Sequence, residues 1–140
     1  MKKILLLLIS LSFFYCDGNK QDNTILPYAS VNETVDLNLP EFINLNIPGG
    51  WAYTTGGLKG LIIYNINGTE FKAFERAAPH LPISSCSQMI IQNSIKMVCP
   101  CDDSKFNILN GQPLTSGINK FAREYWVTHL NSTVLRITNY

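Results

Sequence analysis

The chain is predicted to fold as a single all-β domain of small antiparallel sheets. Blocks of β-branched and aromatic residues recur at short intervals, and Asn, Gly, Pro and Ser separate them. No stretch sustains helical spacing over three turns. The length of 140 residues, with 46% hydrophobic and 15% charged residues, is near the average for one soluble globular domain. A β sandwich or a barrel-like domain is therefore expected.

The N-terminal segment predicts export from the cytoplasm. Lys2 and Lys3 precede an apolar run from Ile4 to Tyr15 that is too short to span a bilayer comfortably. Cys16 closes this run, and a polar stretch follows it. The pattern resembles the signal of a bacterial lipoprotein, in which the cysteine becomes the first residue and carries the lipid. An ordinary secreted protein and an uncleaved anchor are the alternatives, and both still export the chain.

These features divide the chain into three parts. Residues 1–15 are predicted to be a signal peptide, and residues 16–33 a polar tether anchored to the membrane by a lipid on Cys16. Residues 34–140 are predicted to form the β domain. The expected location is the bacterial cell envelope, with the domain facing the periplasm or the exterior. Disulfides persist outside the cytoplasm, so the other three cysteines are expected to form either one disulfide with one thiol left free, or a metal site that uses some of them.

The first strands of the domain are expected between Thr34 and residue 74. Apolar residues alternate around Leu37 and Leu45, and the block LIIY leads to Asn67-Gly68, a strong hairpin signal. These patterns predict strands at 35–39, 43–47, 58–66 and 70–74.

The second half of the domain shows the same pattern of short apolar blocks and turns. Asn93-Ser94, Asn110-Gly111 and Asn131-Ser132 are turn signals between these blocks. The blocks predict strands at 89–91, 95–98, 106–109, 124–129 and 133–138. Trp51 and Trp126 are expected to pack in the domain.

The segment CPCDDSKFNILNGQPLTSG, from Cys99 to Gly117, resembles the second cluster-binding loop of Rieske iron–sulfur domains. That loop usually reads C-P-x-H-G-S-x-F, followed by a glycine turn. The first Rieske loop has a C-x-H-L-G pattern, and Ala78-Pro79-His80-Leu81-Pro82 is similar to it here. The resemblance covers roughly residues 34–138 and implies a Rieske-like (ISP-type) domain with two cluster-binding-type loops.

A Rieske [2Fe-2S] cluster needs two thiolates and two histidines. Carried over position by position, the resemblance leaves only His80 and Cys99 as ligands. Ala78 replaces the other cysteine and offers no donor atom, and Asp102 replaces the other histidine with a hard, charged oxygen. Loss of the cluster is therefore expected, so that no cofactor is bound. A [2Fe-2S] cluster or a single metal on non-standard ligands, His80 and Cys99 among them, is the alternative.

The resemblance also implies a disulfide between the loops. Some Rieske proteins carry one extra cysteine in each loop, and Cys101 occupies the position of the second-loop partner. Cys86 lies a few residues later than the usual first-loop partner. A bond between Cys86 and Cys101 would close about fifteen residues, which contributes on the order of 3 kcal/mol in the chain-entropy model. Cys99 is then expected to remain reduced and buried as a packing residue.

Enzymatic activity and nucleic-acid binding are not expected. The net charge is +1, and Lys and Arg are scattered singly instead of forming a basic stripe. No Ser, His and acid arrangement with a supporting motif is present, and His129 is interpreted as structural.

Two hypotheses of function remain. The first is a lipid-anchored Rieske-like domain that has lost its cluster and serves as a binding or structural module at the cell envelope, with the membrane and an unknown protein as partners. The second is a redox or electron-transfer module with altered ligands.

Overall fold

The computed structural model describes residues 25–139. The predicted signal peptide at 1–15 and the predicted lipidation site at Cys16 lie outside these residues. In the described part, nine strands and one short 3-10 helix follow one another, and every strand pair is antiparallel. No helix of residues 25–139 is long and apolar enough to cross a membrane. The all-β prediction is confirmed.

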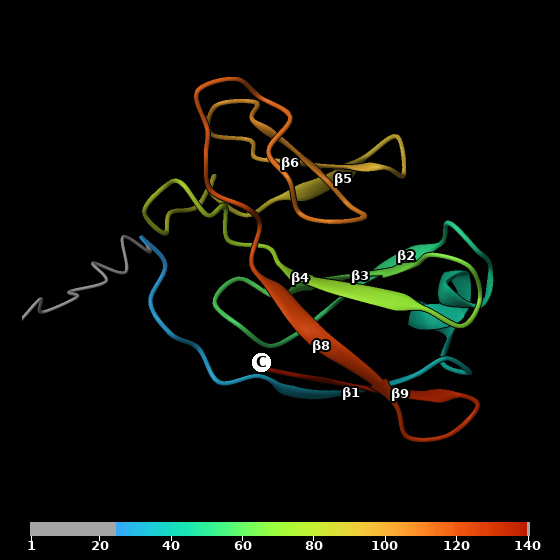
Figure 1. Ribbon diagram of the computed structural model, residues 1–140. Helices are drawn as coiled ribbons and strands as arrows, with labels where there is room; N and C mark the ends of the chain where they lie inside the picture. The colour runs from blue at the N-terminus through green and yellow to red at the C-terminus, as the bar shows by residue number, and fades with distance from the viewer. Residues whose placement is uncertain (1–24, 140) are drawn as a thin grey trace, which may run out of the picture.

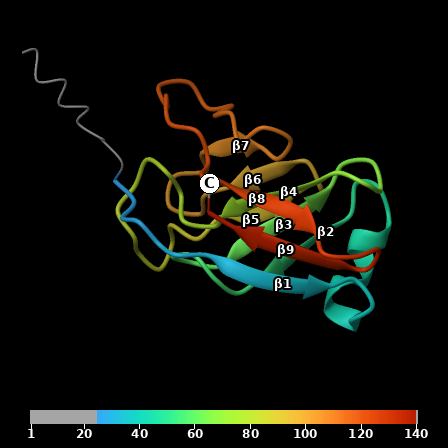
Figure 2. The ribbon, with the colours of Figure 1, turned by 60° about the horizontal axis from the view of Figure 1, so that its bottom comes forward.

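Six strands form one curled sheet in the order β1-β9-β8-β4-β3-β2. Their bounds are β1 Asn32–Asp36, β2 Trp51–Thr54, β3 Leu61–Asn65, β4 Phe71–Glu75, β8 Glu124–His129 and β9 Val134–Thr138. The first residues of β8 pair with β4, and the later ones pair with β9. Because β8 belongs to both halves, it joins the layer of β2, β3 and β4 to the layer of β1 and β9 (Figures 1 and 2).

A second sheet of three strands lies over β2, β3 and β4, on the side away from β1 and β9 (Figure 1). It has the order β5-β6-β7, with β5 at Ile90–Gln92, β6 at Lys96–Val98 and β7 at Lys105–Asn107. Asn93 and Ser94 turn the chain between β5 and β6 with φ values of 53° and 59°. Asparagine tolerates this left-handed conformation, so the predicted turn is confirmed.

Strand β3 lies between two hydrophobic cores, which explains why it reads as a continuous apolar run. All five of its residues are buried. Leu61 and Ile63 belong to the core beneath the six-stranded sheet, which includes Leu135. Ile62 and Tyr64 belong to the core under the small sheet. Side chains alternate between the faces of a strand, so both faces of β3 must be apolar.

The expected strand at 43–47 is wrong, because this segment belongs to a 3-10 helix, η1, at Pro40–Asn46. Pro40 begins the helix, where its fixed φ is favourable and its missing N–H is not needed. Phe42 and Leu45 are buried, whereas Ile43 is 54% exposed. A spacing of three residues places both buried side chains on one face of a 3-10 helix.

Several other predictions need correction. Strand β2, which begins at Trp51, was not predicted. Trp126 was expected to pack inside the domain, but it is 52% exposed. The packed chain also begins before the predicted start near Thr34, since Leu26 and Val31 of the predicted tether are buried. Arg123 holds this segment by donating to the carbonyl oxygens of Leu26 and Pro27, at 2.8 and 2.7 Å.

Candidate functional site

Two loops at one end of the small sheet bring the predicted site residues together. The first loop connects β4 to β5 and carries Ala78, His80 and Cys86, and the second connects β6 to β7. A disulfide joins Cys86 to Cys101, with an S–S distance of 2.03 Å and a Cα–Cα distance of 4.9 Å. This is the pair that the resemblance implies, and it clamps the two loops together.

The second loop turns tightly around the carbonyl oxygen of Cys99. That oxygen accepts hydrogen bonds from the backbone N–H groups of Asp102 and Asp103, at 3.4 and 2.9 Å. Asp103 has a φ of 58°, which aspartate tolerates better than most residues. The Oδ1 atom of Asp102 accepts the N–H of Ser104 at 3.1 Å, as expected for an Asp that caps its own turn. The turn leaves the second oxygen of Asp102 available to the first loop.

His80 and Asp102 meet across the loops. Nε2 of His80 lies 2.8 Å from Oδ2 of Asp102. Burial opposes ionisation of this carboxyl, but hydrogen bonds from His80 and Ser104 outweigh it and lower the pKa of Asp102 to about 2. An ionised carboxylate can only accept, so Nε2 of His80 carries the proton and donates it.

The other ring nitrogen of His80, Nδ1, differs from Nε2 in its surroundings. Nδ1 is buried and makes no hydrogen bond with any residue from 25 to 139. The imidazole lies against Phe106, with ring centroids 5.7 Å apart, and its side chain is 14% exposed. Most buried polar atoms in proteins are hydrogen-bonded, and leaving one unpaired costs roughly 1–3 kcal/mol. A buried nitrogen without a hydrogen bond is a candidate metal ligand, or an atom that served as a ligand in an ancestral cluster site.

Cys99 is a reduced and fully buried thiol. Its Sγ contacts the carbonyl oxygen of Cys86 at 3.8 Å. Burial raises the pKa of Cys99, with a further contribution from the nearby Asp102 carboxylate. The thiol form therefore predominates, and it packs beside Met97 and Phe106 in the core under the small sheet.

The donor set does not fit a Rieske cluster. His80 and Cys99 occupy two of the implied ligand positions, but Ala78 is fully buried at the third and has no donor atom. Asp102, at the fourth, is already hydrogen-bonded to His80. Within residues 25–139, no group of three or more His, Cys, Asp or Glu side chains is placed to hold a metal ion. A cluster with two thiolates and two imidazoles cannot form on these residues.

Ser104, His80 and Asp102 form a contact group that sequence reasoning missed, but it is not a hydrolase triad. Oγ of Ser104 lies 3.2 Å from Nε2 of His80, the same nitrogen that Asp102 binds. In a triad the serine and the acid bind opposite nitrogens of the imidazole, so that the histidine can take the serine's proton. Ser104 is also only 1% exposed, which keeps a substrate away from its oxygen. The group therefore orders the loops and does not supply a nucleophile.

His129, interpreted as structural from the sequence, has structural contacts. Its Nε2 lies 2.9 Å from the carbonyl oxygen of Thr69, and its ring packs edge-on against Phe71 at 5.5 Å.

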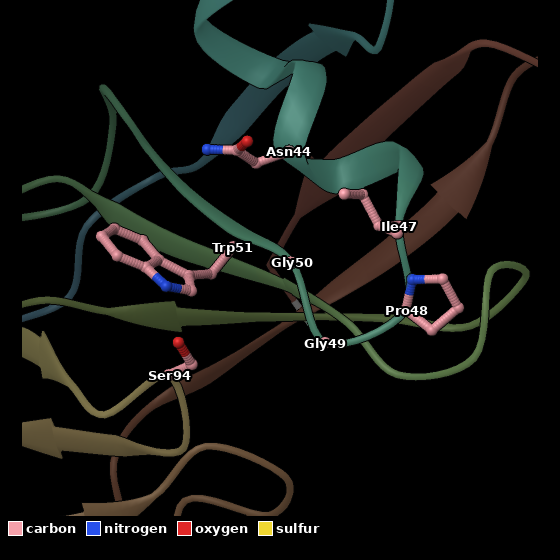
Figure 3. Close-up of a pocket in the computed structure, with 7 residues that line it drawn as sticks. All are labelled: Asn44, Ile47, Pro48, Gly49, Gly50, Trp51 and Ser94. Atoms are coloured by element: carbon pink, nitrogen blue, oxygen red, sulfur yellow. The ribbon is translucent and has the colours of Figure 1, made fainter.

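A groove of about 310 Å³ lies beside the first residue of β2 (Figure 3). Its lining comes from the end of η1, the turn that follows it, and the turn between β5 and β6. Trp51 and Ser94, which are far apart in the sequence, both contribute to it. None of its lining residues is acidic, basic or a cysteine, so it offers shape and an aromatic surface but no acid–base group.

The comparisons with known proteins identify the fold. No family model and no curated protein matches the chain. The ferredoxin of carbazole 1,9a-dioxygenase from Nocardioides aromaticivorans IC177 superposes with a TM-score of 0.51 at 14% identity, over 81% of this chain and all of the ferredoxin. A complex of reduced oxygenase and oxidized ferredoxin in carbazole 1,9a-dioxygenase contains a chain that superposes with a TM-score of 0.50 at 19% identity, over 84% of this chain and 96% of that one. The fold is that of Rieske-like ferredoxins. At this level of sequence identity, the similarity supports an inference about the fold but not about the functional site.

Proposed function

We propose that this protein is an exported, lipid-anchored Rieske-like domain that has lost its iron–sulfur cluster and serves as a binding or structural module at the cell envelope. The main support for the proposal comes from the residues of the two loops and the contacts between them. A histidine–aspartate hydrogen bond and a disulfide connect them, while Ala78 provides no ligand. These contacts can hold the loops in place without a metal.

The fold and the cysteines support the other parts of the proposal. A disulfide between Cys86 and Cys101 would persist best in an oxidising compartment, which supports the proposed export. Leu81 and Ile83 lie in the first loop, and Ile83 is 43% exposed. Leu81 packs against the core under the small sheet, whereas the exposed Ile83 side chain is suited to contact a protein partner.

The alternative is a metal or redox module, and one observation favours it. The Nδ1 atom of His80 is buried without a hydrogen-bond partner among residues 25–139, and the Cys99 thiol is reduced. Both are soft or borderline donors of the kind that bind transition metals. Two such donors are fewer than the three or four protein ligands of most stable sites, so this function ranks second.

A ligand-restoration experiment tests the proposal. The natural chain and the double variant Ala78→Cys with Asp102→His are reconstituted with iron and sulfide without oxygen. The natural chain should remain colourless, because it lacks two ligands, and the double variant should gain the visible absorption of a [2Fe-2S] centre.

The single variant Asp102→His is the matched control, since it restores the histidine but leaves Ala78 without a donor. It should remain colourless. Cluster formation on the natural chain would overturn the proposal. If the double variant does not form a cluster either, its circular dichroism spectrum shows whether it has folded. The result on the natural chain then decides whether the proposal stands.

A further inference from the structure

A shallow groove at the base of the first loop carries two basic side chains. It has a volume of about 500 Å³ and lies along β2 and the turn that leads into β3, on residues that include both ends of the first loop. The groove is lined by polar, basic and aromatic residues that include Tyr53, Thr54, Thr55, Lys59, Arg76 and Gln88. It is separate from the contacts among His80, Asp102 and Cys99.

The guanidinium of Arg76 is held in a fixed orientation. Its Cζ lies 3.8 Å from the centroid of the Tyr53 ring, and its Nε donates to the carbonyl oxygen of Met89 at 3.0 Å. Tyr53 is fixed in turn, because its hydroxyl accepts the N–H of Ile91 at 2.8 Å. No hydrogen bond or ion pair to Nη1 or Nη2 is found among residues 25–139. The two outer nitrogens are therefore oriented and available to a ligand.

Lys59 is positioned by its backbone. Its N–H donates to Oε1 of Glu75 at 2.9 Å, and its carbonyl oxygen accepts Nε2 of Gln88 at 2.6 Å. Its ammonium makes no ion pair with any described residue. A fixed backbone on a groove wall reduces the entropy that Lys59 loses when its ammonium binds a partner.

The positive charge of the groove is only partly offset, by the nearby carboxylate of Glu75. No carboxylate lines it. Glu75 lies behind the wall, and hydrogen bonds from Leu58, Lys59, Ala77 and Tyr125 already occupy both of its oxygens. Burial lowers the pKa of Arg76, and the charges of Tyr53 and Glu75 oppose this effect only in part. An anion in the groove would compensate for the rest of this effect.

We propose that this groove binds an oxyanion of the phosphate class through Arg76 and Lys59. The guanidinium can contact two oxygens at once, and the lysine ammonium and the hydroxyl of Thr54 can contact others. A carboxylate has only two oxygens and would satisfy fewer of these donors. This oxyanion site is independent of whether the two loops bind an iron–sulfur cluster.

One acidic side chain lies at the edge of the site. Oε2 of Glu33 accepts a hydrogen bond from Oγ1 of Thr55 at 3.3 Å. Its negative charge opposes an anion in the groove, so Glu33→Gln should strengthen binding.

The test is an NMR titration of the folded chain with inorganic phosphate, compared with chloride at equal ionic strength. Saturable shifts are expected in the amides of residues 53–60, 76 and 88. Lys59→Gln should weaken binding by about tenfold, as for loss of one charge-assisted hydrogen bond. Lys96→Gln, which lines a different groove, is the matched control and should leave the affinity unchanged.

A second titration uses glycerol 3-phosphate. Tighter binding than for inorganic phosphate would assign a phosphate monoester as the ligand, and weaker binding would assign the free ion. Shifts that do not saturate, shifts equal to those in chloride, or equal affinities in the natural chain and Lys59→Gln would overturn the proposal.

Discussion

His80 and Asp102 occupy two of the four ligand positions that the Rieske resemblance implies, and they bind each other. The contact pairs a protonated Nε2 with a carboxylate whose pKa is about 2. The geometry is that of a cross-loop hydrogen bond with a charged acceptor, which is stronger than a neutral one. Asp102 is 38% exposed, so solvent screens part of this attraction.

The titration of Asp102 tests this contact. The carboxyl carbon of Asp102 should titrate with a pKa of about 2, below the ordinary aspartate value of 3.8. A lowered pKa in the folded state stabilises the protein above about pH 4, and this stabilisation is lost as the pH falls through 2. The measurement is carboxyl-detected NMR between pH 1.5 and 6.

The matched variant is His80→Ala, which removes the donor and should raise the pKa of Asp102. An Asp102 that titrates near 4 in the natural chain would show that the hydrogen bond does not form in solution.

Glu75 connects three elements around one buried carboxylate. It lies at the end of β4 and is fully buried. Its oxygens accept the N–H groups of Leu58, Lys59 and Ala77 and the hydroxyl of Tyr125 on β8. Burial, together with the charge of Glu75, raises the pKa of Tyr125 to about 12, so its hydroxyl remains a donor. A protonated carboxyl could not accept all four bonds, so Glu75 is ionised in the fold.

Glu75→Gln should therefore be strongly destabilising. The amide NH₂ would face N–H and O–H donors where the carboxylate accepted them, and we expect a loss of at least about 2 kcal/mol of unfolding free energy. Urea denaturation measures it. Glu124→Gln is the control, because Glu124 forms a partly exposed ion pair with Lys72 at 2.7 Å, whose loss should cost less than about 1 kcal/mol. Equal effects of the two variants would contradict this assignment of Glu75.

The elements differ in how well the sequence predicts them. Hairpins with Asn-Gly turns and β-branched blocks, such as β3 and β4, are local signals and were predicted. The apolar spacing around Leu45 fits a strand and a 3-10 turn alike, and Pro40 and the tertiary contacts of Phe42 favour the helix. Strand β2 was missed because it is short and lies between glycine-containing turns. It forms by pairing with β3, which is a tertiary contact that the local sequence does not reveal.

The candidate site was predictable only in part. Motif positions pointed to His80, Cys99 and Asp102, and the disulfide partner followed from the resemblance. The hydrogen bond between His80 and Asp102, and its extension to Ser104, depend on how two loops meet in space. The groove at Arg76 and Lys59 depends on the hydrogen bonds of Gln88 and Met89, which no local pattern encodes.

The molecule as a whole combines two hydrophobic cores with two loops that a disulfide and a hydrogen bond connect. Strand β3 serves both cores, and the disulfide fixes the loops at the far end of the small sheet. If the protein serves as the proposed module, these contacts would keep its shape for a partner without a cofactor. The N-terminal Cys16 is the proposed link to the membrane.

The proposed lipid anchor at Cys16 is tested in the full-length chain. Cys16→Ser should move the protein from the membrane fraction to the soluble fraction of the envelope, or stop its processing, because the thiol that carries the lipid is gone. Ser30→Ala leaves Cys16 in place and serves as the control. Metabolic labelling with a fatty acid measures the lipid directly, and an unlabelled natural chain would contradict the anchor.

Loss of the cluster is tested by the iron and acid-labile sulfide content of the natural chain purified without oxygen, together with its visible absorption spectrum. We expect a colourless protein without stoichiometric iron, because Ala78 offers no ligand and Asp102 is bound to His80. A reddish-brown protein with two irons and two sulfides per chain, the content of a [2Fe-2S] centre, would contradict it.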